Sequence, residues 1–483
     1  MDPKDFPHLS RRGFLRQAAC AAVGTLALKT TIRDLRFINT AAGQGTLNDY
    51  KALVCIFLSG GNDANNLIIP RGAEYGNYSA IRQNLAIPEA RVLPITSLNG
   101  DGRLYGFHPG CVKLQTLFGE GKLAPLFNVG TLLHPLTRSQ YQTKSVATPP
   151  QLFSHSDQVT QWQTSIPDQP PRTGWGGRVA DLIHPSQYTL QADGTPTANS
   201  AKISLCTSVA GSNTFEVGNL FQQYQVSTAG AVTLSGVTNA RLQAVKDILA
   251  LPDANLQRNA YADVVEHAIA TGSLLNTAIA GTVSGPYAGG SYWADAFPNT
   301  TLGNQLKMVA RMIQARAGLG MKRQIFFCSV GGYDTHTAQT GLTAGVADPT
   351  VGSHANLLSE LSDSLFAFQR AMEQLGTSTN VTSFTASDFG RTFPTNGQGS
   401  DHGWGNHQLI MGGAVRGQRT YGSFPIQTVN GPDDTSTGRW IPRTSVDQYS
   451  ATLARWFGVT PGNIENVFPN IGRFATPDLG FMG

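Results

Sequence analysis

The residues of this chain best suited to chemistry are aspartates and histidines gathered in four short motifs. The motifs are Gly60–Asp63, Gly331–His336, Ser387–Thr392 and Asp401–His407, and four of the ten histidines fall between positions 336 and 407. Carboxylates and neutral imidazoles together suit a divalent ion, and the flanking glycines let the backbone approach closely. The motifs therefore predict a metal site for Zn, Mn, Mg or Ca. Its candidate ligands are Asp63, Asp334, His336, Asp388, His402 and His407.

Each motif taken alone also has a purely structural explanation. Asp63 and Asp388 could cap helices that follow their strands, a common use of aspartate. The segment from Asp334 to His336 could form a hydrogen-bonded turn. His354 opens an apolar helical stripe and could be a core histidine or a ligand, whereas His407 could face away from His402 or support it from behind.

The predicted secondary structure places these motifs at the ends of strands. Short apolar runs predict buried strands over Ala52–Leu58, Leu123–Val129, Ile203–Thr207, Ile325–Val330, Val381–Ala386 and Leu409–Met411. Helical spacing of apolar residues predicts helices over Asn304–Ala317, from Ser353 to Leu375, and over Thr238–Ile279 with a break at Pro252. The strand–helix–strand order between Ile325 and Ala386 is a βαβ unit, which implies parallel strands.

These elements predict an α/β fold, a large and mostly parallel sheet with helices on both faces. Ligands of such sheets lie outside the carboxyl ends of the strands. Arg391, close to Asp388 in that region, could bind a phosphate or sulfate oxyanion or pair with an aspartate to orient it. No Gly-rich segment matches a P-loop or a dinucleotide fingerprint, so a nucleotide cofactor is not expected.

The N-terminal residues predict export. The segment Ser10–Arg16 contains Arg11-Arg12 and precedes a weakly apolar stretch from Ala18 to Leu28, which is the pattern of a signal read by the twin-arginine translocase. That stretch is about half of the ~20 residues that a spanning helix needs. We expect a signal peptide at residues 1–42 and a single α/β domain with loop insertions at residues 43–483. The mature protein would be periplasmic or extracytoplasmic, exported folded and without a stable transmembrane segment, although a retained signal anchor stays an open alternative.

The charge of the mature protein limits the expected classes of binding partner, and the spacing of its cysteines bears on whether disulfides form. Residues 1–42 hold seven of the 35 Lys and Arg and three of the 31 Asp and Glu, which leaves 28 of each. Binders of polyanions usually carry a basic surplus, so nucleic acid is not an expected partner. The cysteines beyond the signal are Cys55, Cys111, Cys206 and Cys328, and no pair has CxxC spacing. Apolar strand-like runs around Cys55, Cys206 and Cys328 favour buried free thiols.

The signal and the four motifs together resemble an exported bacterial family of uncharacterised function. That resemblance covers nearly the whole chain, and the family is distantly similar to the alkaline phosphatase and sulfatase superfamily. The superfamily pattern would make Asp63 the first metal ligand, with Asp334, His336 and His402 on a second metal. Asp388 would stand for the aspartate of the superfamily's Asp-His-Gly motif, but Phe389 replaces its histidine. One metal site could therefore lack a ligand, have recruited His407 or His354, or be vacant.

The same resemblance places a nucleophile at a helix N-terminus near the metals. The best positional match is the segment from Phe153 to Gln158, in which Ser154 or Ser156 could attack or could merely cap the helix. His155 and Asp157 could be site ligands or an acid–base pair. No Cys or Ser is followed by the x-Pro-x-Arg pattern of sulfatases, so formylglycine chemistry is not expected.

These observations predict an exported metal-dependent hydrolase of phosphate or related esters, with Ser154, His155, Ser156 and Arg391 as candidate catalytic residues. The alternative is a non-catalytic, metal-stabilised binding protein of the same fold, which Phe389 and the uncertain nucleophile favour.

Overall fold

The computed structural model describes residues 47, 49–170, 172–187, 203–219, 221, 223–231, 237–251, 255–283 and 297–483. The expected signal peptide at residues 1–42 and the predicted helix break at Pro252 lie outside this set. No helix within the described ranges combines the length and the apolar character that crossing a membrane requires.

A ten-stranded sheet forms the centre of the described structure, in the order β14-β5-β13-β12-β1-β9-β6-β7-β8 with β15 beside β5. Its strands are β1 (Lys51–Leu58), β5 (Leu123–Gly130), β6 (Cys206–Ser208), β7 (Tyr224–Ser227), β8 (Gly230–Ala231), β9 (Arg323–Val330), β12 (Val381–Ser387), β13 (Asn406–Gly412), β14 (Tyr421–Gly422) and β15 (Thr444–Ser445). All six predicted strands are present, although β6 begins later than expected. Most pairings are parallel, but β13 runs antiparallel to both β12 and β5.

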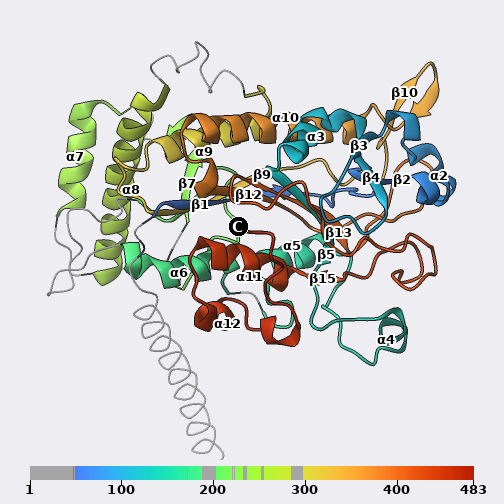
Figure 1. Cartoon of the computed structure of the whole chain (residues 1–483). Coiled ribbons are helices and arrows are strands. Elements are labelled where there is room, and N and C mark those ends of the chain that lie inside the picture. Colours follow the sequence, from blue (N-terminus) through green and yellow to red (C-terminus); the bar gives the residue numbers. More distant parts are fainter. Residues whose placement is uncertain are drawn as a thin grey trace, which may run out of the picture.

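Helices cover both faces of this sheet, as predicted (Figure 1). Side chains of β1 alternate between two cores, because successive residues of a strand point to opposite faces. Val54 and Ile56 pack with α3 (Val112–Gly119), α9 (Thr301–Gln314) and α10 (Ser353–Gln374). Leu53 and Phe57 pack with α6 (Trp175–Gln187), α11 (Val446–Phe457) and α12 (Ile464–Val467). The architecture is an α/β fold.

Smaller elements surround the sheet. The strands β2 (Ile68–Arg71), β3 (Leu93–Ile95) and β4 (Leu104–Phe107) form a second sheet, and β10 (Gly341–Thr343) pairs with β11 (Val346–Asp348). The other helices are α2 (Tyr75–Arg82), α4 (Arg138–Thr143), α5 (His155–Thr164), α7 (Asn239–Leu249) and α8 (Leu256–Ala280). Single 3-10 turns lie at Gly72–Glu74, Gln83–Leu85, Glu89–Arg91, Pro109–Cys111, Gly281–Val283, Ser378–Asn380, Pro461–Asn463 and Ile471–Arg473.

Strand direction brings the chemical motifs to one edge of the sheet. β1, β9 and β12 are parallel, so the loops after Leu58, Val330 and Ser387 leave the sheet on the same side. Because β13 is antiparallel, the residues that precede it reach that side as well. β5 pairs antiparallel with β13 and therefore runs with β1, so the chain after Gly130 also starts there and continues to α5.

The cysteines that the structure describes are buried and free, as the sequence predicted. Cys55, Cys111, Cys206 and Cys328 form no disulfide. Burial raises the pKa of each thiol above its ordinary value. These thiols act as small apolar groups of the core.

A buried carboxyl group gives the fold a pH dependence. Glu216 is completely buried, and burial raises its pKa from 4.5 to about 8. Between these values the unfolded chain is ionised while the folded protein keeps its proton, so the free energy of unfolding falls as pH rises. This one group lowers the free energy of unfolding by about 1.4 kcal/mol for each pH unit in that range. Glu216→Gln should remove that slope between pH 5 and 8 in urea unfolding, whereas Glu465→Gln, at an exposed glutamate, should leave it unchanged.

Candidate metal centre

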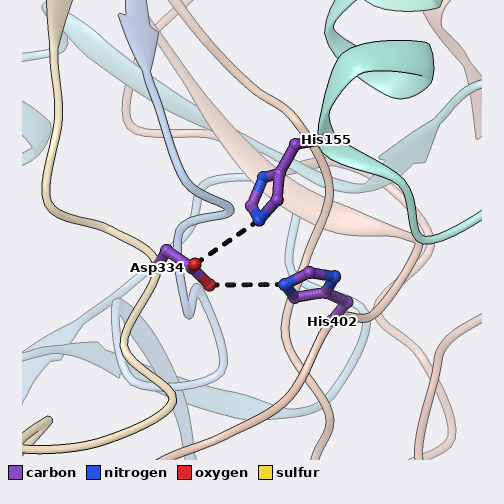
Figure 2. A group of neighbouring side chains, drawn as sticks. All are labelled: His155, Asp334 and His402. Carbon is purple, nitrogen blue, oxygen red and sulfur yellow. Dashed lines mark ion pairs between the residues drawn. The ribbon is translucent and has the colours of Figure 1, made fainter.

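Three imidazoles face the carboxylate of Asp334. His155, His336 and His402 together with Asp334 are called the Asp334 cluster below. Asp334 Oδ1 lies 3.2 Å from His336 Nε2 and 3.3 Å from His402 Nε2, and these two nitrogens are 2.8 Å apart. His155 Nε2 faces the other carboxylate oxygen, Oδ2, at 3.5 Å. Figure 2 shows His155 and His402 pointing toward Asp334 from two sides.

The cluster draws on three separate parts of the chain. Asp334 and His336 follow β9, His402 precedes β13, and His155 is the first residue of α5. Potential ligand atoms of His155, Asp334 and His402 all lie within 4.8 Å of one another. The fold therefore assembles a compact donor set from residues that are far apart in sequence.

Each imidazole of the cluster is held at Nδ1 by an oxygen atom. His155 Nδ1 is 2.7 Å from Asp388 Oδ2, His336 Nδ1 is 2.9 Å from Asp401 Oδ1, and His402 Nδ1 is 2.8 Å from the carbonyl oxygen of Phe153. Carboxylate and carbonyl oxygens only accept hydrogen bonds, so each neutral ring must carry its hydrogen at Nδ1. All three Nε2 atoms consequently present lone pairs toward Asp334.

Such an arrangement is unfavourable without a cation. Two of the lone pairs lie only 2.8 Å apart, and His155 Nε2 is buried with no hydrogen-bond partner. Asp334, Asp388 and Asp401 carry three negative charges and Arg391 one positive charge. With neutral imidazoles this leaves an excess of two negative charges, which a divalent cation would neutralise.

The pKa shifts support neutral imidazole next to ionised carboxylate. Burial lowers the pKa of His402, which favours its neutral form. Partial burial raises the pKa of Asp334, but the hydrogen bond and charge of Arg391 outweigh burial and hold the pKa below its ordinary value. Asp401 follows the same pattern, because bonds from Asn396 and His336 outweigh its burial and lower its pKa. The lone pair of His402 Nε2 is therefore available at neutral pH.

The spacing of the donors fits a small divalent ion. With zinc–ligand bonds of about 2.0–2.1 Å, the ligand atoms of a tetrahedral site lie about 3.3 Å apart. The distances from Asp334 Oδ1 to the Nε2 atoms of His336 and His402 are 3.2 and 3.3 Å, close to this spacing, whereas the two Nε2 atoms lie nearer to each other, at 2.8 Å. Acceptors on the far side of each ring are a general feature of metal-binding histidines. The residues present thus suit Zn²⁺ or another ion that accepts imidazole nitrogen.

A glycine makes the close packing of this edge possible. Gly60 has φ +116°, and a Cβ there would lie 2.4 Å from the backbone nitrogen of Asp334. Its N–H donates to Asp388 Oδ1 at 3.0 Å, and its carbonyl accepts from Arg391 Nη1 at 3.2 Å. Any side chain at this position would push the β1 loop away from Asp334.

The carboxylate behind His155 gives a direct test of ring orientation. Asp388 is buried and accepts from both His155 and Gly60. In Asp388→Asn the amide cannot hold both donors, so we expect activity to fall about 10- to 100-fold, as for other orienting carboxylates, while cation affinity is retained. Asp157→Asn, which removes a carboxylate of the same helix that bonds only serines, is the matched control and should change neither. An unchanged Asp388→Asn variant would mean that this contact does not orient His155.

The structure places Asp63 in a buried ion pair instead of in the Asp334 cluster. Its Oδ2 pairs with Arg82 and accepts from Gln339 at 2.5 Å, and its Oδ1 accepts from Asn65 at 3.1 Å. Both side chains of the pair are fully buried. Burial raises the pKa of Asp63, but Arg82 outweighs it and holds the pKa below its ordinary value. The charged group that contacts Asp63 in the described structure is therefore the guanidinium of Arg82.

His407 and His354 are core histidines in this structure. His407 Nδ1 accepts from the backbone N–H of Asn128 at 3.1 Å, and its ring stacks on Phe424. His354 Nε2 lies 3.1 Å from Asn62 Oδ1. Burial lowers the pKa of each to about 3, so both stay neutral. Their contacts with Asn128, Phe424 and Asn62 hold both rings outside the Asp334 cluster.

Arg391 orients an aspartate, the second of its two sequence-based interpretations. Its side chain is fully buried, and Nη1 donates to Asp334 Oδ1 at 2.7 Å. Nη1 also donates to Gly60, and Nη2 donates to the carbonyl of Ser400. Because both amino groups are used inside the protein, the guanidinium is not presented to an oxyanion. These contacts favour an orienting role for Arg391 over direct binding of an oxyanion.

The two candidate serines point to Asp157. Ser154 Oγ donates to Asp157 Oδ2 at 2.6 Å and lies 3.2 Å from Ser156 Oγ, which also donates to Asp157. Ser154 is the N-cap residue of α5, as the capping interpretation expected, but its hydroxyl accepts no backbone N–H. Between the two serines, His155 reaches the cluster.

Phe389 packs against the imidazoles in place of the histidine that the superfamily pattern would have there. Its ring centroid lies 4.8 Å from that of His155 and 4.6 Å from that of His402. The phenyl ring is fully buried. It therefore gives these two rings a fixed apolar wall and supplies no donor atom.

Two functional residues were not singled out by sequence reasoning. Asp401 orients His336, and Arg82 neutralises Asp63. Asp401 lies inside a motif that was recognised for His402, so its position was a usable signal. Arg82 is an arginine within a short helix, and nothing in its local sequence indicates a buried partner.

Comparison with known structures finds distant likenesses. A protein in the alkaline phosphatase superfamily from Vibrio parahaemolyticus is 12% identical, with 86% of this chain and 68% of that chain covered and a TM-score of 0.33. The C-terminal periplasmic domain of EcEptC from Escherichia coli, in complex with Zn, is 11% identical, with 76% and 74% covered and a TM-score of 0.27. A sulfatase structure from Bacteroides thetaiotaomicron, described with glycosaminoglycan metabolism, is 9% identical, with 85% and 73% covered and a TM-score of 0.32.

A search of curated proteins finds no significant match. A family model does match, over residues 50–436, and its description is "Protein of unknown function (DUF1501)". The matched range includes β1, β9 and β12 and every residue of the Asp334 cluster. The chain belongs to the DUF1501 family.

Proposed function

We propose that this protein is a metal-dependent hydrolase of phosphate or related esters, with its active site at the Asp334 cluster. The observation that carries the proposal is the convergence of three imidazole Nε2 atoms on one carboxylate, each ring held at Nδ1 by an acceptor. Side-chain exposure of 45% for Asp334 and 41% for His336 leaves the cluster open to a substrate.

We assign the cation to Asp334, His336 and His402. These residues meet at one carboxylate oxygen, Asp334 Oδ1, at 3.2 and 3.3 Å. Two histidines and one carboxylate are a known donor set of catalytic zinc sites, which keep a further position open. When bound, such an ion polarises the ester and neutralises charge that develops as the bond to phosphorus or sulfur breaks.

We assign proton transfer to His155 and Asp388. His155 faces the other oxygen of Asp334, so it lies beside the three proposed ligands rather than among them. The buried carboxylate of Asp388 holds its Nδ1–H at 2.7 Å, which fixes the ring and stabilises the protonated form. The Nε2 atom is then free to accept a proton from an attacking hydroxyl group and return it to the leaving group.

The decisive test compares His155→Gln with His402→Gln. Wild-type protein loaded with Zn²⁺ or Mn²⁺ is assayed with p-nitrophenyl phosphate, bis(p-nitrophenyl) phosphate and p-nitrophenyl sulfate, with and without a chelator. We expect chelator-sensitive hydrolysis of at least one ester. His402→Gln should lose both the ion and the activity, whereas His155→Gln should keep the ion and lose about 10²- to 10⁴-fold in rate. A metal-loaded wild type that hydrolyses none of the three would count against the proposal.

The orientation of the serines favours a second candidate, a binding protein that only needs the ion for stability. Ser154 and Ser156 both donate to Asp157, and no hydroxyl of theirs bonds to the cluster. In that case the cation should raise the unfolding temperature of the wild type without any ester being turned over.

Export through the twin-arginine pathway is a separate proposal that rests on Arg11-Arg12 and the apolar stretch after them. Fusing residues 1–42 to a folded reporter should deliver it outside the cytoplasm. Arg11→Lys together with Arg12→Lys should retain it inside, and equal export of both fusions would contradict the proposal.

A further inference from the structure

The position of Arg391 leaves the proposed active site without its expected oxyanion-binding group. Arg391 is buried, and its two amino groups donate to Asp334, Gly60 and Ser400. An enzyme that acts on phosphate or sulfate esters needs donors for the anionic oxygens of its substrate. Besides the proposed metal ion, a cationic side chain near the cluster can supply such donors.

Arg439 contacts two residues that build the cluster. Its Nε donates to the carbonyl of His402 at 2.7 Å. Its guanidinium lies over the ring of Phe153, 4.2 Å from the centroid. Phe153 is the residue whose carbonyl holds His402 Nδ1, and it lies two positions before His155. Arg439 therefore lies where the chain segments that carry His155 and His402 meet.

The guanidinium is fixed in orientation but keeps donors free. One hydrogen bond from Nε and one face against an aromatic ring restrain its plane. Within the described part of the chain, its two amino groups have no hydrogen-bond or carboxylate partner, and the residue is only half-buried. Two neighbouring N–H groups on a restrained guanidinium match the oxygens of a phosphate or sulfate group.

The loop that carries Arg439 is itself rigid. Asp434 Oδ1 accepts the backbone N–H groups of Ser436, Gly438 and Arg439, at 3.1, 2.8 and 3.0 Å. Asp434 is fully buried. A carboxylate that accepts three backbone N–H groups of one loop holds the arginine in place before any ligand arrives.

Phe153 adds an independent sign of a constrained site. It has φ +72°, a left-handed conformation that is unfavourable for a bulky residue. This conformation accompanies its two contacts, the carbonyl with His402 and the ring with Arg439. Backbone strain of this kind clusters at ligand-binding positions.

We propose that Arg439 is the substrate-binding residue that holds anionic oxygens of the phosphate or sulfate group through its two amino groups. The inference rests on the proposed function and assigns to Arg439 the contact that the sequence suggested for Arg391.

The test measures binding of inorganic phosphate and of sulfate to zinc-loaded protein by calorimetry, together with zinc content and the kinetics of p-nitrophenyl ester hydrolysis. In Arg439→Gln we expect the affinity for phosphate or sulfate to fall about 10- to 100-fold and KM to rise, while zinc content and kcat change little. Arg439→Lys should recover part of the affinity for phosphate or sulfate, because lysine keeps the positive charge but cannot donate two parallel hydrogen bonds as a guanidinium does. Arg241→Gln, at an exposed arginine of α7, controls for the loss of one positive charge.

The outcomes separate this inference from the proposed function. Equal anion affinity in wild type and Arg439→Gln would overturn the inference, as would a wild type that binds neither anion. A loss of zinc or of kcat without a change in anion affinity would also overturn it and would make Arg439 a support for His402. Anion binding that depends on Arg439 in a protein without hydrolytic activity would uphold the inference and contradict only the proposed function.

Discussion

Replacing Asp334 with asparagine is expected to remove the cation and the activity together. Asp334 is the one residue that touches all three imidazoles of the cluster and the buried Arg391. The amide removes the negative charge and one of the two acceptor oxygens, so the imidazole lone pairs lose the group that draws a cation between them. Replacing a residue that orients a metal ligand lowers metal affinity or activity about 10- to 100-fold. Replacing Asp334, a proposed ligand itself, should therefore lower the cation affinity by more than about 100-fold.

Cation affinity and ester hydrolysis measured on the same samples check this expectation. Asp348→Asn is the control, because that carboxylate bonds Thr343 and Thr350 in the β10–β11 hairpin and has no contact with the cluster. Circular dichroism must show that both variants are folded. If Asp334→Asn bound the cation as tightly as the wild type, the site would have to be located elsewhere.

The second large effect concerns stability. Asp63→Asn should destabilise the folded protein by about 3–5 kcal/mol, because it leaves the guanidinium of Arg82 buried without a counter-charge. Both side chains of this pair have 0% exposure. The folded fraction should still bind one cation with unchanged affinity, since Asp63 is engaged with Arg82, Gln339 and Asn65.

Urea unfolding with and without added zinc measures both parts of that expectation. Asp478→Asn is a matched control, because Asp478 pairs with Arg455 at the surface and such exposed pairs contribute about 0–1 kcal/mol. A variant Asp63→Asn that is as stable as the wild type but no longer binds the ion would show that Asp63 is a ligand after all.

The sheet and the approximate position of the site could be predicted from sequence because both depend on local patterns. Apolar runs ended by Gly, Asn or Asp marked β1, β9 and β12, and parallel strands necessarily bring such ends to one edge. The donors Asp334, His336 and His402 were named on this basis. The antiparallel direction of β13 was not predicted, yet it is what lets His402, which precedes its strand, reach the same edge.

The partners of individual side chains could not be predicted, because they depend on packing between distant segments. Arg82 and Asp63 are 19 residues apart and pair only because the loop after β1 and α2 fold together. Arg391 was open to two interpretations, and its complete burial favours the orienting one. The sequence offers Ser154, His155 and Ser156 together as catalytic candidates and cannot rank them. Helical geometry turns the imidazole of His155, not the serines, toward Asp334.

X-ray absorption at the metal edge of zinc-loaded protein tests most directly whether the Asp334 cluster holds the ion. We predict scattering from two imidazoles and one carboxylate in the wild type, and loss of the bound zinc in His336→Gln and in His402→Gln. Zinc surrounded only by oxygen atoms, or imidazole scattering that is unchanged in both variants, would contradict this assignment.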